Sequence, residues 1–337
     1  MKSLGERFSF PESSYGGWRR ALNEAAQRAH NAEPVTLVIG SAVPNVDFAP
    51  GEYLHRKFGV RYVMDYRDAW HLDVYTGNTV GNSGDRSTRL ERRLLARATE
   101  AWFVNQPILD WHAHRYPDAA ARYHVVSNGY DDAVATLPLP RKPDPASGLV
   151  FGYLGTIYGP MPLRQSLEGW RAARGESELN ARSSLVIRGR LGHYVTPDAA
   201  SLDTINEFAG DGVSYGGPVS KTAVSGVYNG FDALLLALSS SPYITSGKVF
   251  EYAATGLPIT SVHEPTTAVS SILDGHGAWF PSDDLSAEAI AAAFIATAEY
   301  AVDATANDVT SIRKWATRYS RDHQLSPRID QLGLDAG

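Results

Sequence analysis

The sequence predicts an α/β protein made of two doubly wound domains that face a cleft. Short, almost continuous apolar runs alternate with longer amphipathic segments, and this rhythm is interrupted once by a Pro-rich stretch and then restarts. Apolar runs of this kind are typical of parallel strands whose sheet is covered by helices on both faces. A length of 337 residues fits two such Rossmann-like domains.

The first domain is expected at residues 1–135. Its strands are predicted from four apolar runs, at residues 35–40, 61–66, 101–104 and 123–126. Between these runs, residues 52–59 and 85–100 have the apolar spacing of amphipathic helices.

A segment rich in proline, residues 136–148, reads as a linker. The second domain is expected at residues 149–310. Its strands are predicted at residues 149–155, 184–189, 212–217, 232–238 and 257–262. We expect residues 311–337 to form a C-terminal helix and tail that pack back on the first domain.

Composition excludes several classes of function. The net charge is −6 with no block of basic residues, which argues against a general nucleic-acid partner. The chain has no cysteine, so disulfides, thiol nucleophiles and Cys-ligated zinc are excluded. No apolar run reaches the ~20 residues of a membrane span, and the first residues lack an apolar signal segment. We therefore expect a cytoplasmic protein, with a peripheral position at the membrane as an option.

Common cofactor and metal motifs are missing as well. The sequence contains no complete P-loop, no GxGxxG fingerprint and no HExxH pair. It also lacks a DxD pair that could hold a divalent metal. The expectation is a site without a metal and without a bound cofactor.

One stretch, residues 245–260, has the features of an anion site. Thr245, Ser246 and Gly247 precede an amphipathic segment in which Lys248 is followed, one turn later, by Glu251. A helix N-terminus with small residues and a lysine attracts phosphate, whereas a carboxylate suits a diol. Together they fit a nucleotide diphosphate with its ribose. The alternative is that both charged side chains are solvated residues of a first helical turn.

Four motifs in order resemble glycosyltransferases of the GT-B fold, particularly the retaining family 4. The stretch SGKVFEYAATGLPITSV resembles their donor-binding signature. VVSNGYDDA resembles the end of their N-terminal domain, and LVFGYLGTIY resembles the first strand and loop of their C-terminal domain. YVMDYRDAWHLD resembles a strand end of their N-terminal domain. Only about 34 residues precede the first predicted strand, so we expect an N-terminus that is shortened relative to this family, either because the acceptor-side domain is reduced or because the sequence begins inside it.

The resemblance implies a role for each matching residue in the second domain. Glu251 corresponds to the ribose-binding glutamate, and Lys248 would stabilise the leaving diphosphate as a catalytic group. Tyr243 stands where many members carry a sugar-contacting glutamate. The remaining donor-binding candidates are Gly155, Thr156, Arg188, Tyr215, Gly216, Thr245, Ser246 and Gly247. For Arg188, a pairing with a surface carboxylate is an equal alternative.

In the first domain, Asp68 is the expected second catalytic residue, since it follows a strand at the carboxyl end of the sheet. Arg67 and His71 flank it on the acceptor side. For Arg67, an ion pair with Asp65 or Asp68 is favoured over direct chemistry.

The activity implied by the resemblance is metal-independent transfer of a sugar, with retention, from a nucleotide-diphosphate sugar. The acceptor would be a sugar, a lipid-linked molecule or another small molecule. Two alternatives stay open: a catalytically silent partner protein that binds a sugar nucleotide, and a GT-B-fold sugar-nucleotide epimerase.

A basic strip is predicted on the helix at residues 85–100. Its arginines share one side beside Leu90 and Leu94; they are Arg86, Arg89, Arg93 and Arg97. Such a strip suits weak peripheral contact with anionic lipids. A solvated helix face is the favoured alternative.

Overall fold

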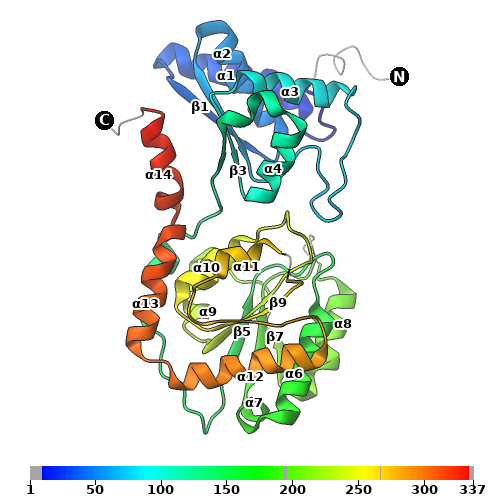
Figure 1. Cartoon of the computed structure of the whole chain (residues 1–337), viewed down its shortest axis with the longest axis vertical. Helices are drawn as coiled ribbons and strands as arrows, with labels where there is room; N and C mark the ends of the chain where they lie inside the picture. Colours follow the sequence, from blue (N-terminus) through cyan, green and yellow to red (C-terminus); the bar gives the residue numbers. More distant parts are fainter. Residues whose placement is uncertain (1–9, 193–195, 266, 334–337) are drawn as a thin grey trace. The chain divides into compact units, whose positions relative to one another are not determined.

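The protein consists of two compact units, residues 1–127 and 128–337, each built on a parallel sheet (Figure 1). The computed structural model describes residues 10–192, 196–265 and 267–333. The predicted α/β class and the two parallel sheets are confirmed.

Unit 1 has a four-stranded sheet in the order β1-β2-β3-β4. The strands are β1 (Leu37–Ala42), β2 (Arg61–Tyr66), β3 (Glu100–Phe103) and β4 (Tyr123–Val125). The α-helices are α1 (Arg19–Ala32), α2 (Ala49–Phe58), α3 (Arg86–Arg97) and α4 (Gln106–Arg115). Short 3-10 helices occupy Gly16–Trp18, Asn45–Phe48 and Pro117–Arg122.

Local chemistry explains where the helices of unit 1 begin and end. The α2 helix ends at Gly59, whose φ of 73° is a conformation that glycine adopts without strain. The α4 helix begins after Asn105, whose side chain accepts a hydrogen bond from the amide of Ile108. The strand β2 therefore begins soon after the end of α2, and α4 begins soon after the end of β3.

Unit 2 has a six-stranded sheet in the order β10-β9-β8-β5-β6-β7. Its strands are β5 (Val150–Leu154), β6 (Ser184–Arg188), β7 (Val213–Tyr215), β8 (Ala233–Ala237), β9 (Ile259–Val262) and β10 (Trp279–Pro281). The chain winds from β5 to β7 and then returns to the other side of β5. In parallel sheets, such a reversal opens a crevice at the carboxyl ends of the two central strands. The described strands of unit 1 follow one direction, so this reversal belongs to unit 2.

Helices cover both faces of the second sheet (Figure 1). The α-helices of unit 2 are α5 (Asp132–Ala135), α6 (Leu163–Glu176), α7 (Glu178–Arg182), α8 (Ala199–Glu207), α9 (Val224–Tyr228), α10 (Gly247–Thr255), α11 (Ala268–Leu273), α12 (Ala287–Asp303), α13 (Ala306–Ala316) and α14 (Arg321–Gln331). Short 3-10 helices lie at Ala209–Asp211, Lys221–Ala223 and Thr317–Tyr319.

Alternate residues of the central strands enter two separate cores. Phe151 packs with Trp170 and Phe294 on one face of the sheet. Leu154 and Leu234 join a second cluster against α10 on the other face. Because both faces are buried, the strands of unit 2 read as continuous apolar runs.

The division between the units falls earlier than the expected boundary at residue 135. Tyr130, Val134 and Leu137 are buried in the core of unit 2, so residues 128–135 fold with the second unit. Arg313 of α13 donates to the carbonyl of Leu137 at 2.7 Å and thereby holds the expected linker against unit 2. The expected packing of the C-terminal helix and tail on the first domain stays a prediction.

All nine predicted strands occur in the structure, with shifts of one or two residues at their ends. The tenth, β10, was missed because only three residues, Trp279–Pro281, pair with β9.

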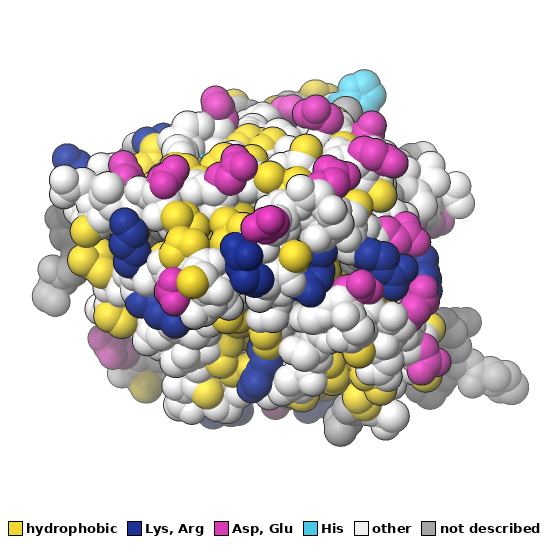
Figure 2. All heavy atoms as spheres, turned by 90° about the horizontal axis from the view of Figure 1, so that it is seen from below, with side chains coloured by type: hydrophobic (Ala, Val, Ile, Leu, Met, Phe, Trp, Pro, Cys, Tyr) yellow, Lys and Arg dark blue, Asp and Glu magenta, His cyan; other side chains and the backbone are white. Residues whose placement is uncertain are grey.

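Within the described ranges, no single helix is long and apolar enough to cross a membrane; α12 and the following helical segment reach that length and apolarity only as a pair bent by 116°. On the face shown in Figure 2, acidic and basic side chains are interspersed.

Candidate functional site

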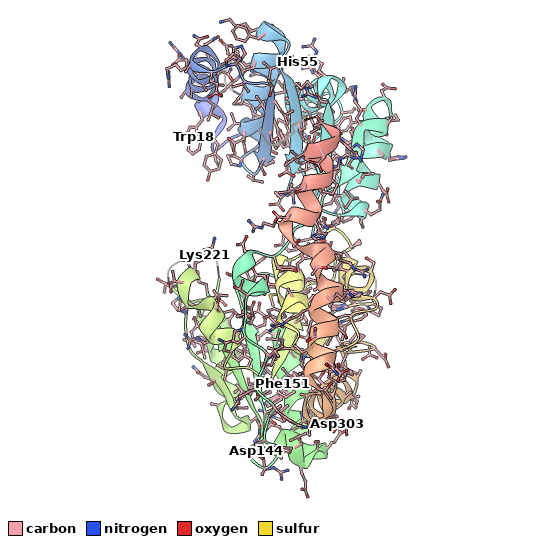
Figure 3. The ribbon with its side chains drawn as sticks, turned by 90° about the vertical axis from the view of Figure 1, so that its left-hand side faces the viewer. Trp18, His55, Asp144, Phe151, Lys221 and Asp303 are labelled. Carbon is pink, nitrogen blue, oxygen red and sulfur yellow. The ribbon has the colours of Figure 1, made fainter. Side chains whose placement is uncertain are left out.

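A cavity of about 330 Å³ lies in unit 2, where the loops after β5, β6 and β7 meet the start of α10. Figure 3 shows Lys221, one of its lining residues, at the opposite end of the unit from Asp144, which precedes β5. The cavity therefore lies at the carboxyl ends of the strands. Its lining residues are Asp131, Val134, Leu154, Gly155, Thr156, Gly189, Arg190, Pro218, Val219, Lys221, Val224, Lys248 and Glu251.

The α10 helix presents its N-terminus here. Ser246 caps the helix, since its hydroxyl accepts a hydrogen bond from the amide of Lys248 at 3.3 Å. The hydroxyl of Tyr252 bonds both the amide and the carbonyl of Leu154, at 2.8 Å and 3.2 Å, and so fixes the helix beside β5. A Cβ atom at Gly247 would meet nothing within 4 Å. Packing therefore does not require this glycine, and open space lies over the first turn.

Lys248 is held at the cavity wall by groups that follow β5 or belong to it. Its ammonium donates to the hydroxyl of Tyr153 and to the carbonyl of Thr156, the latter at 3.3 Å, and lies 4.4 Å from the centre of the Tyr153 ring. Removal of water from the ammonium lowers the pKa of Lys248 to about 8, although nearby Glu251 opposes the shift. The side chain is still mostly protonated at neutral pH and its charge is weakly hydrated.

Glu251 lies one turn further along α10. The hydroxyl of Tyr228 donates to its Oε2 at 3.2 Å. Burial raises the pKa of the Glu251 carboxyl, and the nearby charge of Asp131 adds to this increase. No hydrogen bond to Oε1 is found within the described ranges, so this oxygen can accept one from a ligand hydroxyl.

Two glycines permit the close approach of the β5 and β6 loops. Gly155 has φ of 149°, and a Cβ atom there would lie 2.6 Å from Cδ of Lys248. Gly189 has φ of 127°, and its Cβ would lie 2.0 Å from the carbonyl oxygen of Gly155. Both positions therefore require glycine, for backbone conformation and for space.

Several expected donor-binding residues lie beside the cavity rather than on its wall. Arg188 packs against Gly216, and its Nε is buried without a hydrogen-bond partner within the described ranges. The hydroxyl of Tyr215 donates to the carbonyl of Gly189 at 2.8 Å. This hydrogen bond holds the loop after β6, which lines the cavity. Tyr243 and Thr245 are half-buried in the loop between β8 and α10.

Three charged lining residues were not anticipated from the sequence. Arg190, two positions after Arg188, lines the cavity. Asp131 forms an ion pair with Arg321 at 3.1 Å, and Lys221 approaches the same carboxylate at 3.8 Å. The motif VVSNGYDDA pointed to this region but gave no role to Asp131.

In unit 1, the polar residues after β2 have different surroundings. Arg67 pairs with Asp65, the favoured alternative, and Asp65 also accepts a hydrogen bond from the Ser41 hydroxyl at 2.9 Å. Asp68 is exposed as a whole residue, yet partial desolvation of its carboxyl raises the pKa of that group.

His71 is only 3% exposed, and its Nδ1 lies 2.7 Å from Glu91 Oε2. Glu91 is completely buried on α3 and accepts hydrogen bonds from the hydroxyls of Tyr66 at 3.0 Å and Tyr116 at 2.6 Å. The imidazole of His112, whose Nε2 lies 3.6 Å from Glu91 Oε1, and that of His71 hold the pKa of Glu91 well below its usual range despite burial. This network was missed because Glu91 stands in an arginine-rich helix. Its position one turn before Leu94 and Leu95 was the available signal.

No group of three histidine or acidic side chains that could hold a metal ion occurs within the described ranges.

Comparison with known proteins identifies the fold. No family model matches the sequence, and no curated protein matches it significantly. Among solved structures, sucrose-phosphate synthase from Thermosynechococcus elongatus has a TM-score of 0.61 at 14% identity, over 95% of this chain and 80% of that one. HepE from Anabaena, in complex with UDP, has a TM-score of 0.62 at 13% identity, over 96% and 84%.

A Listeria monocytogenes protein described as a UDP-N-acetylglucosamine 2-epimerase has a TM-score of 0.57 at 11% identity, over 96% of this chain and 82% of that one. The chain therefore has the GT-B fold, which glycosyltransferases share with such epimerases.

Proposed function

We propose that the protein is a retaining glycosyltransferase that takes its sugar from a nucleotide-diphosphate sugar without a metal ion. The observation that carries this proposal is the cavity at the point where the winding of unit 2 reverses. It combines the N-terminus of α10, Lys248 and Glu251 in about 330 Å³. Uridine diphosphate is the first nucleotide to test, because the similar HepE structure holds it.

The diphosphate would bind over the first turn of α10. Helix N-termini carry unpaired amides and a partial positive charge, and Gly247 leaves the space above them open. Lys248 adds a full charge from the cavity wall. Because its pKa is near 8, a bound diphosphate would also favour its protonated form.

The ribose would bind Glu251 through its two hydroxyls. Tyr228 fixes one carboxylate oxygen by its 3.2 Å hydrogen bond and leaves Oε1 for the sugar. A desolvated carboxylate gains more from a hydroxyl donor than a solvated one does. The same desolvation raises the pKa of the Glu251 carboxyl.

In the reaction, the bond between the anomeric carbon and the leaving diphosphate oxygen breaks. The new bond to the acceptor oxygen forms on the same face, and the acceptor proton passes to the diphosphate. Lys248 and the α10 N-terminus would stabilise the growing negative charge. Asp68 of unit 1 would orient the transferred sugar or the acceptor, which is a sugar, a lipid-linked molecule or another small molecule.

Calorimetry with UDP tests the binding part of the proposal. Glu251→Ala is expected to weaken binding by about 1–3 kcal/mol, since a ribose hydroxyl loses a charged partner. Glu299→Ala, which removes an exposed carboxylate from α12, should leave the affinity unchanged. Equal affinities of wild type and Glu251→Ala would remove Glu251 from the site.

Incubation with nucleotide sugars tests the reaction. Transfer or slow donor hydrolysis should continue in EDTA, with the configuration at the anomeric carbon retained. Activity lost on chelation and restored by Mg²⁺ or Mn²⁺ would contradict the metal-free mechanism. Conversion of the donor to its epimer would instead identify a sugar-nucleotide epimerase. Tight UDP binding without turnover would identify a catalytically silent binding protein.

A further inference from the structure

A second hollow, of about 440 Å³, lies in unit 1 and is rich in arginine. Its lining residues are Pro11, Arg19, Arg56, Arg86, Arg89, Leu90 and Arg93. They come from α1, α2, α3 and the segment before α1, and the three helices lie next to one another in Figure 1. The hollow shares no residue with the cavity of unit 2.

The hydrophobic packing of α3 determines which arginines face outward. Leu90 and Leu94 are 8% and 0% exposed and anchor the helix, while Arg89 and Arg93 on the other side are exposed. Glu52 of α2 is buried and ion-paired with Arg93 at 3.0 Å and with Arg97 at 3.9 Å. This shared carboxylate ties α2 to α3 and brings Arg56 toward the arginines of α3.

The charges of this hollow are not balanced by its own wall. Five of the seven lining residues are arginines, and none is acidic. Arg56 and Arg89 have no carboxylate partner within the described ranges, and the nearby Glu52 already serves Arg93 and Arg97. Arg19 and Arg86 make further interactions, so the argument rests on Arg56, Arg89 and Arg93. By contrast, Arg20 on α1 has its own partner, Glu24, at 2.8 Å.

We propose that this hollow binds a small soluble molecule that carries two or more phosphate groups. Guanidinium groups bind phosphate oxygens in pairs, and those of the two neighbouring helices α2 and α3 can approach one compact anion from two sides. The volume is within the ~300–1,000 Å³ range of small-molecule sites. Pro11 and Leu90 add a small apolar surface for the body of the ligand.

A lipid surface is the competing occupant. Trp18 and Tyr15 are 53% and 40% exposed beside Arg19 in the sequence, and Figure 3 shows Trp18 at the margin of unit 1. Aromatic and basic residues together are typical of membrane interfaces. A concave site favours a discrete ligand, because a bilayer presents a flat array of charges that cannot enter it.

Calorimetry with tripolyphosphate tests the proposal on the whole chain, without added UDP, because UDP carries two phosphate groups and would compete for the hollow. Lys248→Ala shows separately how much of the binding belongs to the cavity of unit 2. Arg56→Gln combined with Arg89→Gln should weaken binding at least tenfold. Arg20→Gln combined with Arg92→Gln, on α1 and α3, removes the same charge outside the hollow and should change the affinity less than twofold. Circular dichroism melting verifies that both variants are folded, and Arg93 is kept because Glu52 depends on it.

Three results would overturn the proposal. Wild-type protein without measurable affinity for tripolyphosphate would show that the hollow is not a phosphate site. Equal weakening in the two double variants would mean that only net charge matters. Sedimentation with vesicles containing 30% phosphatidylserine, without any tripolyphosphate binding, would assign the arginines to a membrane surface instead. None of these results depends on whether the proposed sugar transfer is correct.

Discussion

At the residue scale, the surroundings of Lys248 lead us to expect that its removal affects catalysis more than binding. Its ammonium is fixed by Tyr153 and by the Thr156 carbonyl, with little surrounding water. A charge held in this way attracts an anion more strongly than the same charge does in water. In the proposed reaction, this charge would already be in place before negative charge grows on the leaving diphosphate.

Lys248→Ala is therefore expected to lower kcat by about 10²–10³-fold while weakening UDP binding by a smaller factor. Lys221→Ala is the matched control, since it removes the same charge from the same cavity, from a side chain 91% exposed. The control should keep kcat within a few-fold of wild type. Equal losses in kcat and in UDP affinity for Lys248→Ala would mean that the lysine contributes only to binding.

Asp68→Asn addresses the residue proposed to act from unit 1. The substitution should leave UDP affinity and melting temperature unchanged, because the proposed donor cavity is formed by unit 2. Sugar transfer should fall by at least ~10²-fold. Asp110→Asn on α4, an exposed position of the same unit, should have no effect. A stable Asp68→Asn variant with normal transfer would remove Asp68 from the mechanism.

At the scale of elements, the cavity depends on how closely two loops approach. Gly189 follows β6 and would place a Cβ atom 2.0 Å from the backbone oxygen of Gly155, which follows β5. Neither partner can move without disturbing the other, because the Gly155 amide donates to the Arg188 carbonyl at 2.9 Å. The geometry of the site is therefore coupled to the pairing of β5 with β6.

Gly189→Ala should accordingly lower the free energy of unfolding by more than about 2 kcal/mol, through steric clash and an unfavourable φ. Gly175→Ala in the exposed face of α6 is the matched control, since a Cβ atom there meets nothing within 4 Å. It should leave stability unchanged or raise it by up to about 1 kcal/mol. Urea titrations measure both variants, and similar stabilities would show that the loops separate without cost.

At the scale of the whole molecule, buried histidines make stability depend on pH. His276 is 2% exposed, its Nε2 lies 3.3 Å from the Ala253 carbonyl, and burial lowers its pKa to about 4. An unfolded chain takes up a proton at this side chain near pH 6.5, the ordinary value, whereas the folded chain does so only near pH 4. The unfolded state therefore binds more protons between these values, and stability falls as the pH falls through this window.

Between pH 6.5 and pH 4, protonation of His276 should lower the free energy of unfolding by up to about 3 kcal/mol. Unfolding by urea at a series of pH values measures it, and His276→Gln should reduce this loss. His323→Gln, an exposed position on α14, should retain the wild-type dependence. A His276→Gln variant with the full wild-type slope would assign the acid sensitivity to other groups.

The sequence by itself determined the α/β class, the strands of both sheets and the start of α10, because these follow from local patterns. Continuous apolar runs mark buried parallel strands, and Ser246 followed by Gly247 and Lys248 marks a helix N-terminus. The strand β10 escaped because three paired residues carry too little pattern.

Only the tertiary structure decided which side chains share a site. Arg190 rather than Arg188 lines the cavity because Arg188 packs against Gly216. Glu91 has the local sequence of a surface residue, yet it is buried by contacts with side chains at least 20 positions away along the chain, such as His71. The arginine hollow likewise needs three helices to meet. Spacing along one element cannot predict such arrangements, since they depend on which faces the sheets and helices bring together.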